Sequence, residues 1–263
     1  MPRPITRVPG VGCRVPGTTT TDDSRFVRFP APGPRYPEPA GKEWMAMHKT
    51  VDIELGADVL AANARIAEEN LKRLRARGVV SFDFMGSIGS GKTLLIERMV
   101  DILKKKGKKA AAIAGDVAGD DDYSRFRKHG IDAVNVNTGK ECHLDAHLID
   151  HALEDLKLDG LDVLFVENVG NLVCPTDFPL GTDKRVVVIS VTEGDDMVRK
   201  HPVIFSLADF IVINKIDIAK VIEVDPKILV RDAKKLRPKA PIFLTDAKHG
   251  KGVPDLMKAM GIW

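Results

Sequence analysis

Eight consecutive residues of this chain have the types and spacing of a phosphate-binding loop, in which a glycine-rich turn ends in Lys and then Ser or Thr. The apolar run 79–85 before them predicts a buried strand, and the apolar-periodic stretch after them predicts a helix. Backbone N–H groups and the positive end of that helix would point at phosphate oxygens. Lys92 is expected to reach the β- and γ-phosphates, and the Thr93 hydroxyl to hold Mg²⁺. The residues predicted to bind the nucleotide phosphates are Gly86, Ser87, Gly89, Ser90, Gly91, Lys92 and Thr93.

A second set of residues predicts which base the nucleotide carries. Asn214-Lys215-Ile216-Asp217 follows an apolar strand-like run, and ligands of parallel sheets bind beyond the carboxyl ends of the strands. The Asp217 carboxylate can accept hydrogen bonds from the ring N1–H and the exocyclic amine of guanine. Adenine offers neither donor there, so guanine should be strongly preferred. Lys215 would lie along the base, and Asn214 would fix the loop and reach the base edge.

The last predicted strand leads into Thr245-Asp246-Ala247-Lys248, which resembles the Ser-Ala-Lys loop of GTPases. In that loop the backbone N–H at the position of Ala247 meets the guanine oxygen, and Lys248 completes the pattern. Asp246 stands where Ser is usual.

Acidic residues follow two other predicted strands. Asp116 and Asp122 come after the strand 109–115, and Glu167 ends the strand 162–167. Glu167-Asn168-Val169-Gly170 occupies the place of the Asp-x-x-Gly element that senses the γ-phosphate, where a glycine lets the backbone approach closely. We expect Asp116, Asp122 and Glu167 to surround Mg²⁺ together with Thr93, and Lys92, Glu167 and Asp116 to act in catalysis. For Asp122 the alternative is a solvated helix start, where acids favour the dipole.

Cysteines and histidines form a candidate site for another metal. Cys142 and His143 stand at the predicted start of a helix, 143–157, where a thiolate is stabilised, and His147 follows one turn later on the same face as His143. Cys174 comes four residues after the γ-phosphate element. Thiolates with imidazoles suit Zn²⁺ or Ni²⁺, and so few ligands predict a site completed by water or a second subunit. The alternative is a pair of inert cysteines with surface histidines.

The short distance in sequence between the γ-phosphate element and Cys174 suggests a switch. The state of the nucleotide would move one metal ligand relative to Cys142 and His143. Hydrolysis would then change metal affinity.

Composition places these residues in one globular domain with an N-terminal extension. Residues 1–46 hold nine of the 16 prolines and no apolar period, so we expect them to be disordered, with Met45 or Met47 as an alternative natural start. The net charge of +3 gives no argument for nucleic acid. No apolar run approaches the roughly 18 residues of a membrane span. Three cysteines and the lack of a secretory signal predict a cytoplasmic protein without membrane partners.

Residues 47–263 alternate between strand and helix patterns. Continuous apolar strands predict a three-layer α/β fold of the P-loop NTPase type, with a mostly parallel seven-stranded sheet and helices on both faces, preceded by a helix at 55–77. The predicted strands are 79–85, 109–115, 132–136, 162–167, 185–191, 209–214 and 241–245, and the predicted helices of the domain are 92–106, 121–129, 143–157, 226–236 and 253–260.

On these residues the chain resembles the HypB family, and especially its archaeal members, which are GTPases that help to load nickel into [NiFe]-hydrogenase. The resemblance runs from about Met47 to the C-terminus and rests on the loop Gly86–Thr93, Gly115-Asp116, the runs 137–147 and 167–175, and Asn214–Asp217. It implies GTP hydrolysis and a homodimer formed or tightened by GTP. It further implies Ni²⁺ or Zn²⁺ held between subunits by Cys142, His143 and Cys174, with His147 at a second metal.

The same resemblance implies two protein partners, a HypA-type nickel metallochaperone and the hydrogenase large-subunit precursor. The chain departs from many bacterial members, which carry an N-terminal Cys-x-x-Cys-Gly-Cys site or a histidine-rich tract. Here that region has only Cys13 and no histidine before His48, so nickel storage there is not expected.

Four other interpretations stay open. The related urease GTPase, UreG, uses a Cys-Pro-His motif, whereas Thr176 follows Cys174-Pro175 here. A GTPase chaperone of another metalloenzyme, such as a cobalamin-dependent mutase, would not need Cys142 or Cys174. A small-molecule kinase would not need Asn214–Asp217. A nucleotide-gated scaffold would show no turnover even with partners present.

Overall fold

The computed structural model describes residues 42–263, with side chains described from Asp58 onward. The chain divides into two compact units, Met1–Met47 and His48–Trp263, and the second unit carries the sheet described here. The disorder expected for residues 1–46 therefore concerns mainly residues outside the described part of the chain. The last residues of that segment, from Lys42 onward, belong to the first helix, α1 (Lys42–Arg75).

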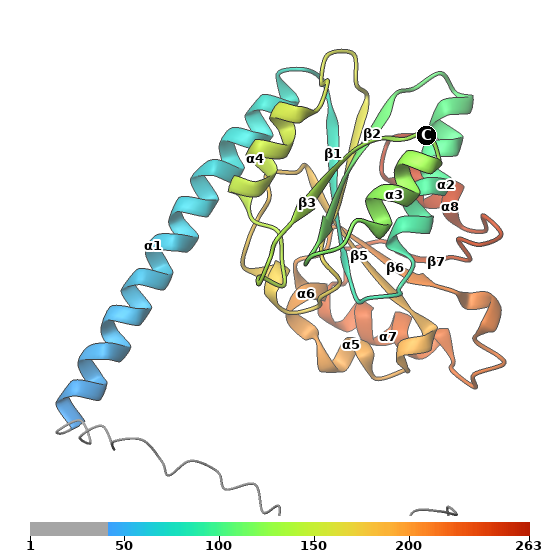
Figure 1. The fold of residues 1–263 in the computed structure, drawn as a ribbon. Helices are drawn as coiled ribbons and strands as arrows, with labels where there is room; N and C mark the ends of the chain where they lie inside the picture. Colours follow the sequence, from blue (N-terminus) through green and yellow to red (C-terminus); the bar gives the residue numbers. More distant parts are fainter. Residues whose placement is uncertain (1–41) are drawn as a thin grey trace, which may run out of the picture. The chain divides into compact units, whose positions relative to one another are not determined.

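Seven parallel strands form a single sheet in the order β3-β2-β4-β1-β5-β6-β7 (Figure 1). Their bounds are β1 Val80–Gly86, β2 Ala110–Asp116, β3 Asp132–Asn137, β4 Val163–Glu167, β5 Lys184–Ser190, β6 Phe210–Asn214 and β7 Ile242–Leu244. Every bound lies within one residue of its prediction. Such runs are easy to recognise because strands covered on both faces are apolar throughout.

Four helices of the domain also agree with their predicted bounds to within one residue. They are α2 Lys92–Lys105, α3 Asp121–Lys128, α7 Pro226–Leu236 and α8 Val253–Ala259. Two short helices were not predicted, α5 Met197–Lys200 and α6 Pro202–Ser206, because four or five residues are too few to show a helical period.

The predicted starts of two helices are wrong. Helix α1 begins at Lys42 rather than Leu55, and no proline stands between these two residues to mark a later start. Helix α4 (Ala146–Asp155) begins three residues later than predicted. Asp145 is extended, and its carboxylate accepts a hydrogen bond from the Leu148 N–H at 2.8 Å, so it caps the helix and leaves His143 outside.

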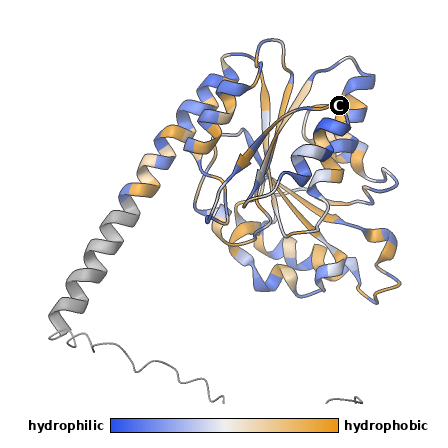
Figure 2. Cartoon of the chain, viewed as in Figure 1, coloured by the Kyte–Doolittle hydropathy of each residue, from blue (hydrophilic) through white to orange (hydrophobic). Residues whose placement is uncertain are grey.

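Helices cover both faces of the sheet, as predicted (Figures 1 and 2). One face packs against α2, α3 and α8 in a core that includes Phe82, Phe84 and Phe165. On the other face, α1 and α4 cover β2 and β4, while α5, α6 and α7 cover β5 and β6. Within residues 42–263, no helix is long and apolar enough to cross a membrane.

Two buried asparagines dock α1 on the sheet domain. Asn63 Nδ2 donates to Pro179 O at 2.9 Å, and its Oδ1 accepts from Ala146 N at 2.8 Å. About two helical turns later, Asn70 Nδ2 donates to Ala146 O at 2.8 Å and to Leu180 O at 3.2 Å. These bonds tie α1 to the first residue of α4, directly after the segment that holds Cys142 and His143.

Candidate functional site

The phosphate loop lies between β1 and α2, as predicted. Lys92, Thr93 and Ser90 are buried, and Lys92 Nζ donates to the carbonyls of Gly86 and Ser87 at 3.2 Å each. Gly91 has a φ of 100°, and a Cβ there would lie 2.3 Å from Asn214 Nδ2, so only glycine fits this turn. The Ser90 hydroxyl is buried without a hydrogen-bond partner among residues 58–263, which suits a loop that binds an anion.

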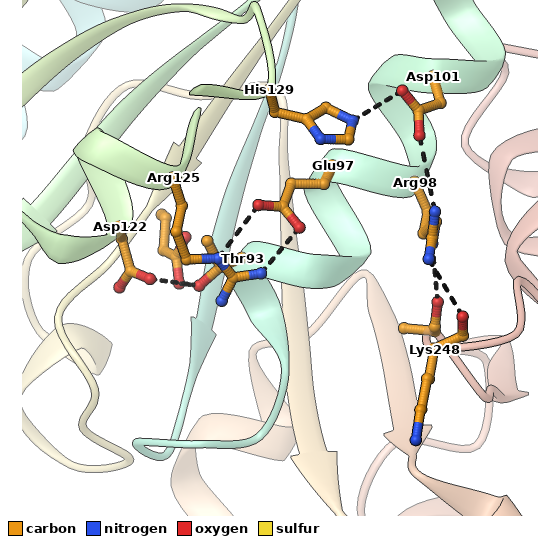
Figure 3. A network of polar contacts seen from close by, with 10 residues as sticks. Thr93, Glu97, Arg98, Asp101, Asp122, Arg125, His129 and Lys248 are labelled. Atoms are coloured by element: carbon orange, nitrogen blue, oxygen red, sulfur yellow. Dashed lines mark hydrogen bonds and ion pairs between the residues drawn. The ribbon is translucent and has the colours of Figure 1, made fainter. Parts of the chain in front are cut away.

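A cavity of about 470 Å³ opens beside this loop, between Asp116-Val117, the start of α3 and the segment that follows β4. Two carboxylates converge there on one hydroxyl: Thr93 Oγ1 lies 2.7 Å from Asp122 Oδ1 and 2.9 Å from Glu167 Oε1. Figure 3 shows Asp122 reaching Thr93 from α3. A hydroxyl and two carboxylates supply oxygen donors of the kind that Mg²⁺ prefers.

The environment of Glu167 fits a cation as well. The pKa of Glu167 is raised to about 7, mainly by burial and in smaller part by the nearby Asp122, while Lys92 acts in the opposite direction. Its second oxygen, Oε2, is buried and has no hydrogen-bond partner among the described side chains. A divalent cation between these groups would favour the charged carboxylate and so lower this pKa.

Asp116 lines the same cavity, but its Oδ1 accepts a hydrogen bond from the Val117 N–H at 2.6 Å. The sequence analysis missed Arg125. This residue of α3 lines the cavity and forms a two-point ion pair with Glu97, at 3.2 and 2.8 Å (Figure 3). It is the one Arg at the cavity within residues 58–263, and a lone Arg on a short polar helix carries no signal in the sequence.

A second cavity of about 290 Å³ adjoins the first through Gly91 and Leu94. It collects the predicted base-binding residues Asn214, Lys215, Asp217, Ala247 and Lys248. Asn214 organises them: its Nδ2 donates to Ser90 O at 3.0 Å, and its Oδ1 accepts from Thr245 Oγ1 and from Ala247 N at 3.0 and 3.1 Å. The phosphate loop and the base loop are therefore held by one side chain.

The 245–248 loop has two further supports. Arg98 of α2 donates to the carbonyls of Ala247 and Lys248 at 3.2 Å each (Figure 3). Asp246 is buried, and both of its oxygens accept hydrogen bonds from His249, one from the backbone N–H and one at 2.6 Å from Nδ1. The carboxylate that replaces the usual Ser thus has its own partner, His249, three residues later.

Cys142, His143 and Cys174 come together, with one ligand atom of each within 4.8 Å of the others. The Cys142 thiol donates to Cys174 Sγ at 2.7 Å. The His143 ring lies over Phe178 with the centroids 4.0 Å apart, and its Nδ1 is buried with no hydrogen-bond partner in the part of the chain that the structure describes. Two sulfurs beside an unpaired imidazole nitrogen are a ligand set for Zn²⁺ or Ni²⁺.

The local reasons given for this site from the sequence were wrong in two respects. Because α4 begins at Ala146, Cys142 and His143 lie in the preceding loop, and His143 does not share a helix face with His147. The hydrogen bond to Cys174, followed by burial, raises the pKa of the Cys142 thiol, whereas a helix start would have lowered it. His147 instead lies beside His151, with Nε2 atoms 3.3 Å apart.

Sequence reasoning also missed two asparagines that hold the metal loop (residues 138–145). Both come from the β4 loop (residues 168–174). Asn168 Oδ1 accepts from Leu144 N at 3.2 Å, and Asn171 Nδ2 donates to Cys142 O at 3.2 Å. Their place directly after a predicted strand could have marked them as site residues, but nothing in the sequence indicated which groups they bond.

Asp83 gives a pH-dependent prediction. Burial raises the pKa of this carboxyl from its usual 3.8 to about 6. Between these values the native state binds more protons than the unfolded state, so the wild type loses stability as pH rises. The Asp83→Asn side chain does not titrate, so the variant lacks this loss. Its free energy of unfolding minus that of wild type should be about 2 kcal/mol larger near pH 7.5 than near pH 4.5. Urea denaturation of the nucleotide-free proteins measures it, and an equal advantage at both pH values would contradict it.

The chain was compared with known proteins. The family model "CobW/HypB/UreG, nucleotide-binding domain" matches residues 82–244. A protein of Methanocaldococcus jannaschii named "Probable hydrogenase maturation factor HypB" is 55% identical over 212 residues, which is 81% of this chain and 96% of that protein. The hydrogenase/urease maturation factor HypB of Helicobacter pylori is 38% identical over 208 residues, covering 78% of this chain and 85% of the relative.

Two solved structures share the fold at high sequence identity. HypB from Archaeoglobus fulgidus has a TM-score of 0.70 and 49% identity, covering 75% of this chain and 96% of that one. HypB from Helicobacter pylori in complex with nickel has a TM-score of 0.71 and 39% identity, covering 75% and 92%. The family-model match, residues 82–244, includes the phosphate loop, the cysteine–histidine cluster and Asn214–Asp217. The chain therefore belongs to the HypB family of hydrogenase maturation factors, within the CobW/HypB/UreG group of P-loop GTPases.

Proposed function

We propose that this protein is a GTP-hydrolysing metallochaperone that binds nickel or zinc at Cys142, His143 and Cys174 and drives nickel insertion during maturation of [NiFe]-hydrogenase. One observation carries the proposal. A single short segment, from Glu167 to Cys174, begins with a buried carboxylate in the phosphate-side cavity and ends with a metal ligand. The nickel-bound structure of the Helicobacter pylori relative supports nickel as the cargo.

The residues of the first cavity fit hydrolysis of GTP. Thr93, Asp122, Glu167 and Asp116 would hold Mg²⁺, which neutralises charge on the β- and γ-phosphates. Lys92 would bind the phosphate oxygens, at the cost of its present bonds to backbone carbonyls. Glu167, which is buried and has a free oxygen, would orient the attacking water.

The residues of the second cavity fit guanine. Asp217 would accept from the N1–H and the exocyclic amine, and Asn214 would keep the phosphate loop and the base loop in register. Lys215 has a φ of 61°, a left-handed conformation that is rare for a residue with a side chain and that belongs to the turn holding this loop. The side chain of Lys215 would cover the base.

The metal cluster fits a site that is shared or open. Three protein ligands leave a fourth position for water or for a residue of a second copy. Exposed apolar side chains lie nearby, since Ile88 is 84% and Val173 60% exposed, and they favour a GTP-dependent homodimer across this face. The proposed partners are a HypA-type metallochaperone and the hydrogenase large-subunit precursor, in the cytoplasm. His147 remains our candidate for a second metal.

Maturation of urease is a second candidate function. The Helicobacter pylori relative carries both hydrogenase and urease in its name. The chemistry of the three ligands is the same for either acceptor, so only transfer experiments with each apoenzyme separate the two.

Binding of Ni²⁺ tests the proposal. We expect wild type to show a thiolate-to-nickel charge-transfer band, with an affinity that differs between GDP and a non-hydrolysable GTP analogue. Cys142→Ala should lose the band, because one of two thiolates is gone. Cys13→Ala, a cysteine of the N-terminal extension, is the matched control and should bind as wild type. A wild type without the band in either nucleotide state would refute the metal site, and equal affinities in both states would refute the switch.

A further inference from the structure

A buried carboxylate that neither cavity uses lies in the middle of the sheet. Asp83 is in β1 and fully buried. It points to the face opposite Phe82 and Phe84, away from α2. Its Oδ1 accepts a hydrogen bond from Asn168 Nδ2 at 3.2 Å, while Oδ2 has no partner within the described side chains. Burying such a group is costly, and the attraction of Arg185 on the neighbouring strand offsets part of the cost, so the role of its one hydrogen bond calls for an explanation.

That contact fixes the orientation of the Asn168 amide. With Nδ2 directed to Asp83, the oxygen Oδ1 faces two backbone donors, Leu144 N at 3.2 Å and Val169 N at 3.0 Å. An amide turned the other way would place its NH₂ against these two N–H groups and its oxygen against the carboxylate. The backbone of Asn168 is fixed as well, since its N–H donates to Phe84 O at 3.1 Å.

The hydrogen bond to Leu144 holds the centre of the metal loop. Leu144 is the residue after His143, and its side chain is fully buried against Gly115, where a Cβ would lie 2.6 Å from Leu144 Cδ1. On the other side of His143, the carbonyl of Cys142 accepts from Asn171. Two asparagines of the β4 loop therefore form hydrogen bonds with the backbone of the residues on either side of His143.

We propose that Asp83 and Asn168 are positioning residues of the metal site. The carboxylate orients the Asn168 amide, the amide holds Leu144, and Leu144 keeps His143 within reach of Cys142 and Cys174. The inference rests on the proposed function, because it assigns these residues to metal binding. Since Asn168 directly follows Glu167, the same bond joins the metal loop to the phosphate-side cavity. Loss of the bond should reduce the difference in nickel affinity between the GDP and GTP-analogue states.

Nickel titration of full-length variants, followed by the thiolate charge-transfer band, tests the proposal. Outer groups that orient ligands typically affect metal affinity by about 10- to 100-fold, and we expect a loss of that size for Asp83→Val. Asp83→Asn keeps an oxygen that accepts from Asn168 and should recover most of the affinity. Ser81→Val is the matched control. Ser81 is buried two residues earlier on the same face of β1, but its partner is Asp183, so nickel affinity should not change.

A double-mutant cycle tests whether Asp83 acts through Asn168. Asn168→Ala should lose about as much affinity as Asp83→Val, and the double variant no more than either. Additive losses, or Asp83→Val with wild-type affinity, would overturn the inference. A cooperative urea-unfolding transition shows that each variant is folded, and Asn168→Ala carries the test if Asp83→Val does not fold. A wild type that lacks the nickel band would instead overturn the proposed function.

Discussion

Glu167→Gln is expected to lower kcat for GTP hydrolysis by about 10²- to 10³-fold, the range seen when a single catalytic acid–base or electrostatic group is removed. Gln keeps the size of the side chain and an oxygen for Thr93, which lies 2.9 Å from the carboxylate. It removes the charge that would hold Mg²⁺ and orient water. Phosphate release at saturating GTP and Mg²⁺ measures the effect.

The control for this variant is Glu154→Gln, on the exposed side of α4, whose side chain is 63% exposed. It should hydrolyse GTP as wild type does. If Glu167→Gln kept wild-type kcat, the chemistry would have to be assigned to the other carboxylates of the cavity, Asp116 and Asp122.

Asp217→Asn should weaken GDP binding by about 10³-fold, because the amide NH₂ would face the N1–H and the exocyclic amine of guanine, leaving buried donors unpaired. Xanthine has a carbonyl where guanine has that amine. The variant should therefore bind xanthosine diphosphate better than GDP, which reverses the preference of wild type. Competition against a fluorescent nucleotide measures both affinities.

Asp255→Asn is the matched control, an exposed aspartate on α8 with a side chain that is 74% exposed. It should leave both affinities unchanged. If Asp217→Asn bound GDP as tightly as wild type, another group of the 290 Å³ cavity would have to recognise guanine, and Asp246 would be the first to test.

The sheet could be predicted from the sequence because its strands are short continuous apolar runs, and the residues that bind ligands stand where those runs end. The phosphate loop and Asn214–Asp217 follow from the same rule, and the structure brings them to adjoining cavities. These elements depend on local sequence and on the topology of parallel sheets.

The structure of the metal loop could not be predicted from local sequence patterns. The helix pattern was extended back to His143, whereas Asp145 caps α4 and Leu144 is pulled into the core beside Gly115. The roles of Asp83 and Asn168 depend on partners 85 and 24 residues away along the chain. Contacts of this kind leave no period and no spacing in the sequence, so only the folded chain displays them.

The two asparagines of α1 restrict where this helix can sit along the sheet domain, because their hydrogen bonds form only at one position of the helix along its axis. Apolar side chains alone would let a helix slide along its groove with small changes in energy. If α1 moved by one turn, about 5.4 Å, the N–H and the carbonyl of Ala146 and the carbonyls of Pro179 and Leu180 would all lose their partners. Each unpaired buried group costs about 1–3 kcal/mol. The two asparagines therefore fix the position of α1 along its axis. A helix with the same apolar face but without the asparagines would have several positions of similar energy.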